Sequence, residues 1–391
     1  MKILLCHNYY QQRGGEDQSF ESEMQLLRQH GHDVRCHTCH NDEVAKLGHL
    51  KTAARTLWNR QAYREVRSLL RQWRPDVMHC TNTFPLLSPS VPAAGRAEGV
   101  PVVLSLRNYR LACLNSYFFR DGRVCEDCLG RAPWPGVRHA CYRDSRSGSA
   151  VVAAMLMYHR ARRTWQRSVD RFFTPSAFAR AKLAEAGLPA ERIDVKPNFV
   201  DPDPGPGDGG GGYAIFAGRL SPEKGIGTLL DAWRRLDGRL PLKIVGDGPL
   251  QDTVAQAAAV TPGVEWLGRR EHGELLDLIG DAVCLVQCSE WYETFGRTIV
   301  EAHARGTPTL VAQLGAVAEL VEPGRSGLLF QPGDAGQLAD CVARLLDDPA
   351  TTARMRQQCR AVFLERFTAE RNHQLLMDIY RRAGAEVDGA K

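Results

Sequence analysis

The sequence predicts an α/β protein made of two domains, each built around a parallel β-sheet. Short apolar segments alternate with amphipathic helical segments along most of the chain, and this alternation favours parallel strands covered by helices on both faces. A segment rich in proline and glycine at residues 201–212 interrupts the pattern, which then starts again. The chain has 391 residues, which is too many for one ordinary hydrophobic core and enough for two.

The first domain is predicted over residues 1–200. Its strands are short apolar runs bounded by polar or turn-forming residues. They are expected at residues 2–6, 33–37, 76–80, 100–105 and 171–174, with a helix at 16–30 after the first strand. Strand, helix and strand in succession form the repeating unit of a parallel sheet.

The second domain is predicted over residues 213–371, after a linker at 201–212. The linker holds three prolines and six glycines, which exclude a regular helix or strand. Beyond it, strands are expected at 213–217, 242–245, 264–266, 282–286 and 309–311, and helices at 225–236 and 335–346. A last amphipathic helix is expected at 369–382.

Composition restricts the class of protein. Hydrophobic residues make up 43% of the chain and charged residues 24%, which is typical of a soluble globular protein. The N-terminus turns polar too soon for a signal peptide, and no apolar run approaches the roughly 18 residues of a membrane-spanning helix. We therefore expect a cytoplasmic protein.

The two halves of the chain differ in charge. Residues 1–200 hold 30 Lys and Arg against 18 Asp and Glu, whereas residues 201–391 hold 20 against 27. Arginines at near-helical spacing in the first half predict either a peripheral contact with anionic lipid at the inner membrane face or an ordinary solvated helix surface. No nucleic-acid-binding motif accompanies the charge, so no nucleic-acid partner is expected.

Two glutamates mark the segment that says most about function. Glu293 and Glu301 stand with seven residues between them, the first in a turn-like segment ending at Gly296 and the second in the following helix. A helix N-terminus offers backbone N–H groups to a phosphate, and carboxylates accept hydrogen bonds from sugar hydroxyls. Together these features indicate a nucleotide sugar, and the alternative is a pair of solvated surface carboxylates.

A second segment, residues 217–225, follows a strand and opens a helix. It places Arg219 and Lys224 near each other around a tight turn. Two cations held in this way can neutralise a diphosphate leaving group, with Arg as a planar fork and Lys as a point charge. The alternative is a surface turn that carries unrelated basic residues.

Glycines mark two further turns at the ends of predicted strands. Gly246 and Gly248 follow one strand, where such turns line ligand crevices in open α/β sheets. Gly14 and Gly15 follow the first strand, where paired glycines let backbone N–H groups approach an anion at a helix start. Simple turns are the alternative at both places.

These segments together resemble glycosyltransferase family 4, a family of retaining glycosyltransferases. Glu293 and Glu301 match its E-x7-E signature, residues 218–225 are similar to its G-R-x-x-x-x-K-G motif, and residues 246–249 to its G-x-G-P element. The resemblance implies the GT-B fold, in which two Rossmann-like doubly wound domains face a cleft. It also implies a C-terminal helix, here at about 372–391, that crosses back to the first domain.

The resemblance implies that Glu293 contacts the donor hexose, that Glu301 contacts the ribose, and that the loop with Arg269 reads the base. The residues expected to bind the donor are Gly14, Gly15, Arg219, Lys224, Gly246, Gly248, Arg269, Glu293, Phe295, Gly296 and Glu301.

Arg219, Lys224 and Glu293 are expected to carry the reaction. The two cations would stabilise the leaving diphosphate in place of Mg²⁺. We therefore expect metal-independent chemistry without a cofactor. The donor would be a nucleoside-diphosphate sugar, and the acceptor a glycan, a lipid-linked sugar or a small molecule.

One segment departs from the family. Arg107 stands before Asn108, Tyr109 and Arg110, where relatives usually have a histidine that lies near the reacting sugar. Arginine cannot act as a base near neutral pH, but it can bind a phosphate or an anionic sugar. We therefore expect Arg107 and Asn108 on the acceptor side of the cleft, with His7 either substituting for the missing histidine or serving a structural role.

Four of the 12 cysteines cluster in the first half. Cys125 and Cys128 form a C-x2-C pair flanked by Cys113 and Cys141, and these spacings suit a structural Zn²⁺ site. Reduced thiols without metal are the alternative.

Three other functions stay open at this point. A nucleotide-sugar epimerase or hydrolase on the same architecture would need a base at the sugar, and none is evident at Arg107. A dinucleotide-dependent oxidoreductase would need G-x-G-x-x-G after the first strand, which Gly14 and Gly15 do not provide. A non-catalytic sugar-nucleotide-binding partner of a larger assembly is compatible with Arg107.

Overall fold

The computed structural model describes residues 1–387, and its contacts divide the chain into two compact units. The first unit comprises residues 1–117 and 126–197 together with the C-terminal segment from residue 372, and the second comprises residues 118–125 and 198–371. The C-terminal segment thus belongs to the first unit although it follows the second in sequence. The last residues of the predicted returning helix, 388–391, lie outside the described residues.

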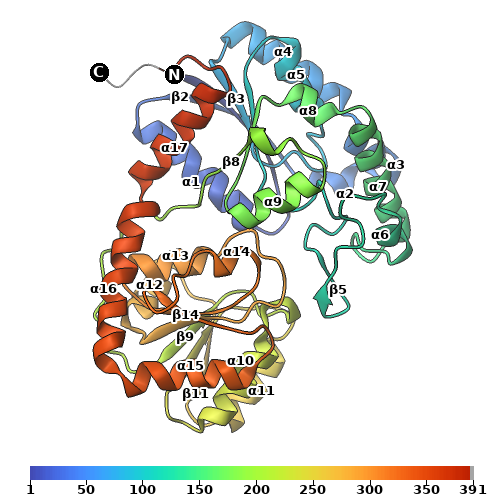
Figure 1. Cartoon of the computed structure of the whole chain (residues 1–391). Coiled ribbons are helices and arrows are strands. Elements are labelled where there is room, and N and C mark those ends of the chain that lie inside the picture. Colours follow the sequence, from blue (N-terminus) through green and yellow to red (C-terminus); the bar gives the residue numbers. More distant parts are fainter. Residues whose placement is uncertain (388–391) are drawn as a thin grey trace. The chain divides into compact units, whose positions relative to one another are not determined.

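The first unit contains a parallel sheet of six strands in the order β2-β1-β3-β4-β7-β8 (Figure 1). The strands are β1 (Lys2–Tyr9), β2 (Asp33–His40), β3 (Val77–Cys80), β4 (Val102–Ser105), β7 (Arg171–Thr174) and β8 (Ile193–Val195). The helices are α1 (Gly15–Gln29), α2 (Glu43–Leu47), α3 (His49–Leu57), α4 (Arg60–Trp73), α5 (Ser90–Ala97), α6 (Trp134–Arg138), α7 (Arg146–Ala161), α8 (Thr164–Ser168), α9 (Ala177–Glu185) and the 3-10 turn η1 (Ala190–Arg192). The strand order reverses beside β1, so the sheet is doubly wound.

Two hydrophobic clusters cover the two faces of this sheet. Leu4 points into one cluster, while Ile3 and Leu5 point into the other, as the two-residue period of a strand requires. The second cluster includes Tyr380 of α17 (Ala369–Arg382). The C-terminal helix therefore forms part of the helical layer on one face of the first sheet.

The second unit repeats this architecture with the order β11-β10-β9-β12-β13-β14, also parallel. The strands are β9 (Ala214–Ala217), β10 (Leu242–Val245), β11 (Val264–Gly268), β12 (Cys284–Gln287), β13 (Thr309–Ala312) and β14 (Gly327–Phe330), and a hairpin is formed by β5 (Phe119–Arg120) and β6 (Arg123–Val124). The helices are η2 (Pro222–Lys224), α10 (Ile226–Leu236), α11 (Gln251–Val260), α12 (His272–Asp281), α13 (Arg297–Ala304), α14 (Gly315–Ala318), α15 (Ala335–Asp347) and α16 (Pro349–Arg366). Figure 1 shows helices on both faces of this sheet as well.

The segment 201–212, predicted as an interdomain linker, packs against the second unit and belongs to it. Gly207 N donates to Arg305 O over 2.8 Å, and Gly211 N donates to Asp281 O over 2.9 Å. A Cβ at Gly207 would lie 2.4 Å from the carbonyl oxygen of Gly280. The glycines therefore allow close backbone packing here, in addition to preventing regular structure.

Every strand predicted from the sequence overlaps a strand of the structure. The sequence pattern does not predict β8 or β14, which have only three and four residues. Each lies at the edge of its sheet, where very short strands are common.

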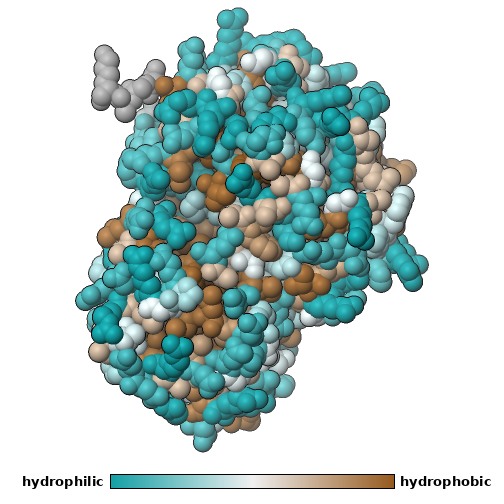
Figure 2. All heavy atoms as spheres, viewed as in Figure 1, coloured by the Kyte–Doolittle hydropathy of each residue, from teal (hydrophilic) through white to brown (hydrophobic). Residues whose placement is uncertain are grey.

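The arginine-rich helix α4 is amphipathic, with Val66 and Leu70 among its buried residues. On its other face, Arg67 and Arg71 both form ion pairs with Glu98. This arrangement favours the interpretation of a solvated helix surface, and Figure 2 shows hydrophilic residues over most of the visible surface. No helix within residues 1–387 has the length and apolar character needed to cross a bilayer.

Candidate active site

Glu293 lies in a polar cluster that follows strand β12. Its Oε1 accepts hydrogen bonds from Lys224 Nζ and Gln287 Nε2, each over 2.7 Å, and from Ser289 Oγ. Glu293 is buried, with 8% of its surface exposed. Because Gln287 is the last residue of β12, the carboxylate lies at the carboxyl edge of the second sheet, where open α/β folds bind their ligands.

The loop before α10 brings Lys224 to this cluster. Lys224 ends the 3-10 turn η2 and is followed by Gly225 at φ +69°. A Cβ at Gly225 would lie 2.1 Å from the carbonyl oxygen of Cys288. Glycine therefore lets this loop pack against the segment after β12, and that packing sets Lys224 beside Glu293.

Two more glycines join this loop to the turn after β10. Gly246 and Gly248 have φ angles of +138° and +150°. A Cβ at Gly246 would lie 1.9 Å from the carbonyl oxygen of Gly218, and a Cβ at Gly248 would lie 2.5 Å from that of Leu220. Leu220 N also donates to Asp247 O over 2.7 Å. The two glycine-containing motifs are therefore two backbone turns in direct contact.

Glu301 is buried on α13, with 3% of its surface exposed. Its Oε1 lies 3.2 Å from Arg297 Nε and 3.9 Å from His272 Nε2. Burial raises the pKa of Glu301, although the neighbouring Arg297 guanidinium and His272 side chain act in the opposite direction. The second glutamate of the signature thus lies beside a guanidinium and an imidazole.

The start of α13 is shaped by Gly296, which precedes its first residue. A Cβ at Gly296 would lie 2.7 Å from Ile299 Cδ1. Phe295 is buried in the same hydrophobic cluster as Ile299. Phe295 therefore anchors this turn in the core, which leaves the backbone around Gly296 as the part suited to meet a phosphate.

Arg219 and Arg269 are both exposed. Within the described part of the chain, neither side chain forms a hydrogen bond or an ion pair. An exposed guanidinium keeps its N–H donors available for a ligand phosphate. The structure therefore brings Lys224 and Glu293 together and leaves Arg219 and Arg269 outside their cluster.

In the first unit, the loop with Gly14 and Gly15 leads into α1. Gly14 N donates to Asp17 Oδ2 over 3.0 Å, and Asp17 Oδ1 lies 2.8 Å from His7 Nε2. Burial acts to raise the pKa of Asp17, but the hydrogen bonds from His7 and Gly14 lower it. His7 is fully buried and stacks on Phe20, with 4.4 Å between ring centroids. This geometry favours a structural role for His7 in supporting the glycine loop.

Arg107 is buried and pairs with a carboxylate of its own unit. Its Nη2 donates to Glu23 Oε1 over 2.6 Å, and Lys196 Nζ donates to the same oxygen. Burial alone would raise the pKa of Glu23, but the charges of Arg107 and Lys196 outweigh it and lower the pKa to about 2. The guanidinium that the sequence predicts on the acceptor side thus pairs through Nη2 with Glu23, which lies 84 residues away in sequence. Its role toward an acceptor stays a prediction.

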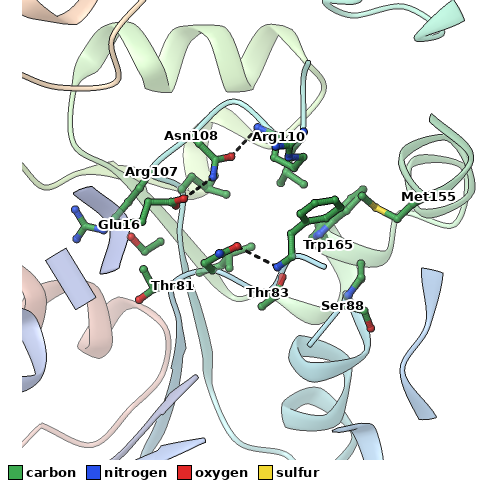
Figure 3. Close-up of a pocket in the computed structure, with 16 residues that line it drawn as sticks. Glu16, Thr81, Thr83, Ser88, Arg107, Asn108, Arg110, Met155 and Trp165 are labelled. Carbon is green, nitrogen blue, oxygen red and sulfur yellow. Dashed lines mark hydrogen bonds between the residues drawn. The ribbon is translucent and has the colours of Figure 1, made fainter. Parts of the chain in front are cut away.

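Asn108 lines a pocket at the carboxyl edge of the first sheet (Figure 3). Its Nδ2 donates to Glu16 Oε2 over 2.8 Å, and its Oδ1 accepts from Arg110 N over 2.8 Å. Asn108 thus holds Glu16, from the first turn of α1, at the wall of this pocket.

Two family models match the chain. The model "Glycosyltransferase Family 4" matches residues 14–204, and the model "Glycosyl transferases group 1" matches residues 203–381. Together they extend from the glycine loop before α1 into α17 and include Lys224, Glu293 and Glu301. The chain belongs to glycosyltransferase family 4.

Curated relatives of this family 4 protein include two enzymes of Mycobacterium tuberculosis. A glycogen synthase is 28% identical over 302 residues, which are 74% of this chain and 64% of that protein. A GDP-mannose-dependent alpha-mannosyltransferase is 30% identical over 289 residues, which are 71% of this chain and 66% of that protein. The matched region thus spans somewhat less than two thirds of the glycogen synthase.

Among solved structures, the Anabaena HepE protein in complex with UDP is similar over the whole chain. The TM-score is 0.69 at 20% identity, and the match covers 97% of this chain and 99% of that one. At this identity the likeness establishes the fold alone, which is the two-domain GT-B fold.

Several residues that hold the signature glutamates in this family 4 protein are not identified from the sequence. Gln287 and Ser289 contact Glu293, and His272 and Arg297 lie beside Glu301. For Gln287 a signal exists, because it is a polar residue at the carboxyl end of a buried strand. His272 carries no comparable signal, since it reaches Glu301 from a different helix.

The four clustered cysteines divide between the units. Cys113, Cys128 and Cys141 belong to the first unit, and Cys125 belongs to the second. Cys113 and Cys128 are buried, and Cys113 Sγ lies 3.0 Å from Asn115 Oδ1. The zinc site predicted from their spacing stays a prediction.

Proposed function

We propose that this protein is a retaining glycosyltransferase that moves a sugar from a nucleoside-diphosphate sugar to an acceptor hydroxyl. The observation that carries the proposal is the Lys224–Glu293 pair at the carboxyl edge of the second sheet, with Nζ and Oε1 2.7 Å apart. Two glycine-containing turns in direct backbone contact support this part of the structure. Family membership supports the same activity. It does not favour an epimerase or a hydrolase.

The second unit would bind the donor. Lys224 has three N–H donors, so one can remain on Glu293 while another meets a phosphate oxygen. Arg219, exposed and without an internal partner among the described residues, would supply the second cation. These fixed charges would stabilise the leaving diphosphate as its charge develops, which is why we propose metal-independent transfer.

The glutamates would orient the donor. The Glu293 carboxylate would accept hydrogen bonds from sugar hydroxyls, and the Glu301 carboxylate would accept them from the ribose. The backbone at Gly296 would meet a phosphate, and the loop with Arg269 would lie against the base. In the first unit, the Gly14 and Gly15 loop is proposed as a further phosphate contact.

The remaining proposals concern the acceptor, the place of action and zinc. The acceptor is a hydroxyl of a glycan, a lipid-linked sugar or a small molecule, bound by the first unit. We propose that the protein acts in the cytoplasm and makes a peripheral contact with the inner face of the membrane. We also retain a structural Zn²⁺ held by the thiolates of Cys113, Cys125, Cys128 and Cys141.

A panel of UDP-, GDP-, ADP- and dTDP-sugars tests the proposed function. A donor that binds the native state raises the thermal midpoint by mass action, so one nucleotide series should stabilise the protein. The stabilising donor should then support transfer, with the anomeric configuration of the product retained. A protein that none of these donors stabilises would contradict the proposal.

A further inference from the structure

Three histidines of the first unit meet at the end of helix α1. His30 directly follows the last residue of α1, His32 directly precedes β2, and His373 lies near the start of α17. His30 is exposed, and the other two are half-buried. Because His32 comes just before a strand begins, the cluster lies at the amino edge of the first sheet. Open α/β folds bind their ligands at the opposite, carboxyl edge.

A glycine turn fixes the backbone that carries His30 and His32. Gly31 lies between them at φ +77°, in the left-handed region. Its N–H donates to Arg28 O over 3.0 Å, and His32 N donates to Leu27 O over 3.1 Å. These two hydrogen bonds form a Schellman turn, a common end of a helix at glycine. Two imidazoles therefore project from either side of a well-defined turn.

Helix α17 brings the third imidazole to this turn. Leu376 of α17 shares a hydrophobic cluster with Leu27 of α1, and the two helices lie side by side (Figure 1). His373 Nε2 lies 3.0 Å from His32 Nε2. The His373 ring also stacks on the His30 ring, with 3.7 Å between centroids. Tertiary packing thus gathers side chains that are more than 300 residues apart in sequence.

The distance between the two facing nitrogens suits two ligands of one metal ion. Zn²⁺ binds imidazole nitrogen at about 2.0–2.1 Å, so two nitrogens on a tetrahedral ion lie about 3.3 Å apart. His32 and His373 share one hydrogen bond in the metal-free protein, and an ion can take the place of its proton, which moves to Nδ1 of the same ring. His32 Nδ1 lies 3.4 Å from the Met1 amino group, a contact too long to fix the tautomer of His32.

His30 has a further feature of a metal ligand. Its Nδ1 lies 2.9 Å from Leu26 O. A carbonyl oxygen only accepts, so Nδ1 carries the proton of the neutral ring and Nε2 keeps its lone pair. Metal-binding histidines usually donate their other N–H to a carbonyl or a carboxylate in this way. A ring nitrogen of His30 lies within 4.8 Å of one of His373, and the exposed His30 side chain can turn toward a shared ion with little loss of packing.

We propose that His30, His32 and His373 bind a divalent transition-metal ion of the Zn²⁺ type. The ion joins the end of α1 to α17 and so holds the C-terminal helix on the first unit. Three protein ligands leave one position for water, so the ion exchanges with solvent more readily than one held by four thiolates. The proposal does not depend on the proposed transfer reaction, and it uses none of the clustered cysteines.

Calorimetry with Ni²⁺ tests the proposal on the full-length protein, prepared without a histidine tag and dialysed against metal-free buffer. Imidazole suits Ni²⁺ as well as Zn²⁺, whereas thiolates select Zn²⁺, so Ni²⁺ reports on the histidines. We expect one Ni²⁺ per chain, displaced by Zn²⁺, and a higher thermal midpoint with the ion bound. A wild-type protein that binds no Ni²⁺ would overturn the proposal.

Substitution of the histidines gives a sharper test. His30→Gln, His32→Gln and His373→Gln should each weaken Ni²⁺ binding about tenfold or more, since even the loss of an outer partner of a ligand costs about 10–100-fold. Because these side chains are exposed or half-buried, the variants should fold, and a thermal midpoint measured without metal checks this. His49→Gln is the matched control, an exposed histidine at the start of α3. It should bind Ni²⁺ as the wild type does.

The outcomes separate this site from the other proposals. Wild-type affinity in the three cluster variants, or an equal loss in His49→Gln, would show that the cluster is not the site. Binding that is lost in Cys125→Ser but kept in His373→Gln would assign the ion to the cysteines and overturn the proposal. If the protein binds Ni²⁺ through the histidines but no nucleotide sugar stabilises it, the metal site stands and only the proposed function fails.

Discussion

Lys224 and Glu293 lie 69 residues apart in sequence and meet at 2.7 Å in the second unit. The Lys224 ammonium also lies 5.5 Å from the centroid of the Trp291 ring. A lysine fixed on two sides in this way loses little further freedom when a ligand binds. Preorganisation of this kind is what stabilisation of a developing phosphate charge requires.

Removal of either partner should reduce transfer. We expect Glu293→Gln to lower kcat/KM about tenfold to 100-fold, because it weakens hydrogen bonds to sugar hydroxyls, and Lys224→Ala to lower it about 100-fold or more. Steady-state kinetics with the best donor measures both effects. Glu274→Gln, on the exposed surface of α12, should leave kcat/KM unchanged. Normal turnover by Glu293→Gln would exclude an essential role for this residue.

Arg219→Ala should weaken binding of the nucleotide without lowering the stability of the protein. Arg219 is exposed and has no partner within residues 1–387, so its removal should shift the thermal midpoint by no more than about 1 °C. The Kd of the nucleoside diphosphate should rise about tenfold or more, measured by calorimetry, because a charge-assisted contact is lost. Arg234→Ala, an exposed arginine on α10, serves as the control and should change neither quantity. An unchanged Kd for Arg219→Ala would remove Arg219 from the donor site.

Gly246→Ala should destabilise the second unit. The new Cβ would lie 1.9 Å from Gly218 O at a φ of +138°, so both sterics and backbone conformation oppose it. We expect the free energy of unfolding to fall by about 2–4 kcal/mol in urea titrations, with loss of nucleotide binding. Gly227→Ala is the matched control, since a Cβ in that helical position meets nothing within 4 Å and should be neutral or slightly stabilising. Equal stability of the two variants would show that the contact between the glycine turns is not needed.

Glu23 should make stability depend on pH in acid. Its pKa is about 2 in the folded protein against an ordinary value of 4.5, so the folded state binds fewer protons than the unfolded state between these values. The stabilisation is complete above about pH 4.5 and is lost as the pH falls toward 2. Glu23→Gln should cost about 3 kcal/mol at pH 7, because it leaves Arg107 and Lys196 buried without a counter-charge.

Urea titrations at several pH values check this expectation. The difference in unfolding free energy between wild type and Glu23→Gln should shrink as the pH falls from 4.5 to 2. Glu21→Gln is the control, since Glu21 lies on the same helix and forms its ion pair with the exposed Arg13. A difference that stays constant with pH would contradict the assigned role of Glu23.

Zinc content gives an independent prediction. Elemental analysis of the purified protein should find about one zinc ion per chain, and Cys125→Ser or Cys128→Ser should lose it together with several degrees of thermal stability. Cys36→Ser, an exposed cysteine outside the cluster, should keep the metal. A wild-type protein without zinc would show that the four clustered cysteines are reduced thiols that bind no metal.

Much of the candidate donor site could be proposed from the sequence because its signals are local. The spacing of Arg219 and Lys224, the two signature glutamates and the glycines at strand ends are each contained in a short segment, where turn chemistry and helix starts act. The residues that these segments contact could not be predicted in the same way. Gln287 and His272 approach the glutamates from separate elements, and no periodicity in their own segments indicates that approach.

The sequence by itself determined the alternation of strands and helices, the presence of two sheets and the residues of the donor motifs, because these depend on apolar period and on backbone-specific residues such as glycine. Only the tertiary structure decided that Arg107 pairs with Glu23 and Lys196, that residues 201–212 pack on the second unit, and that Thr81 and Ser105 share one pocket wall. The reason is physical: which partner a buried charge or hydroxyl meets is set by packing between segments far apart in the chain, and burial makes that partner decisive.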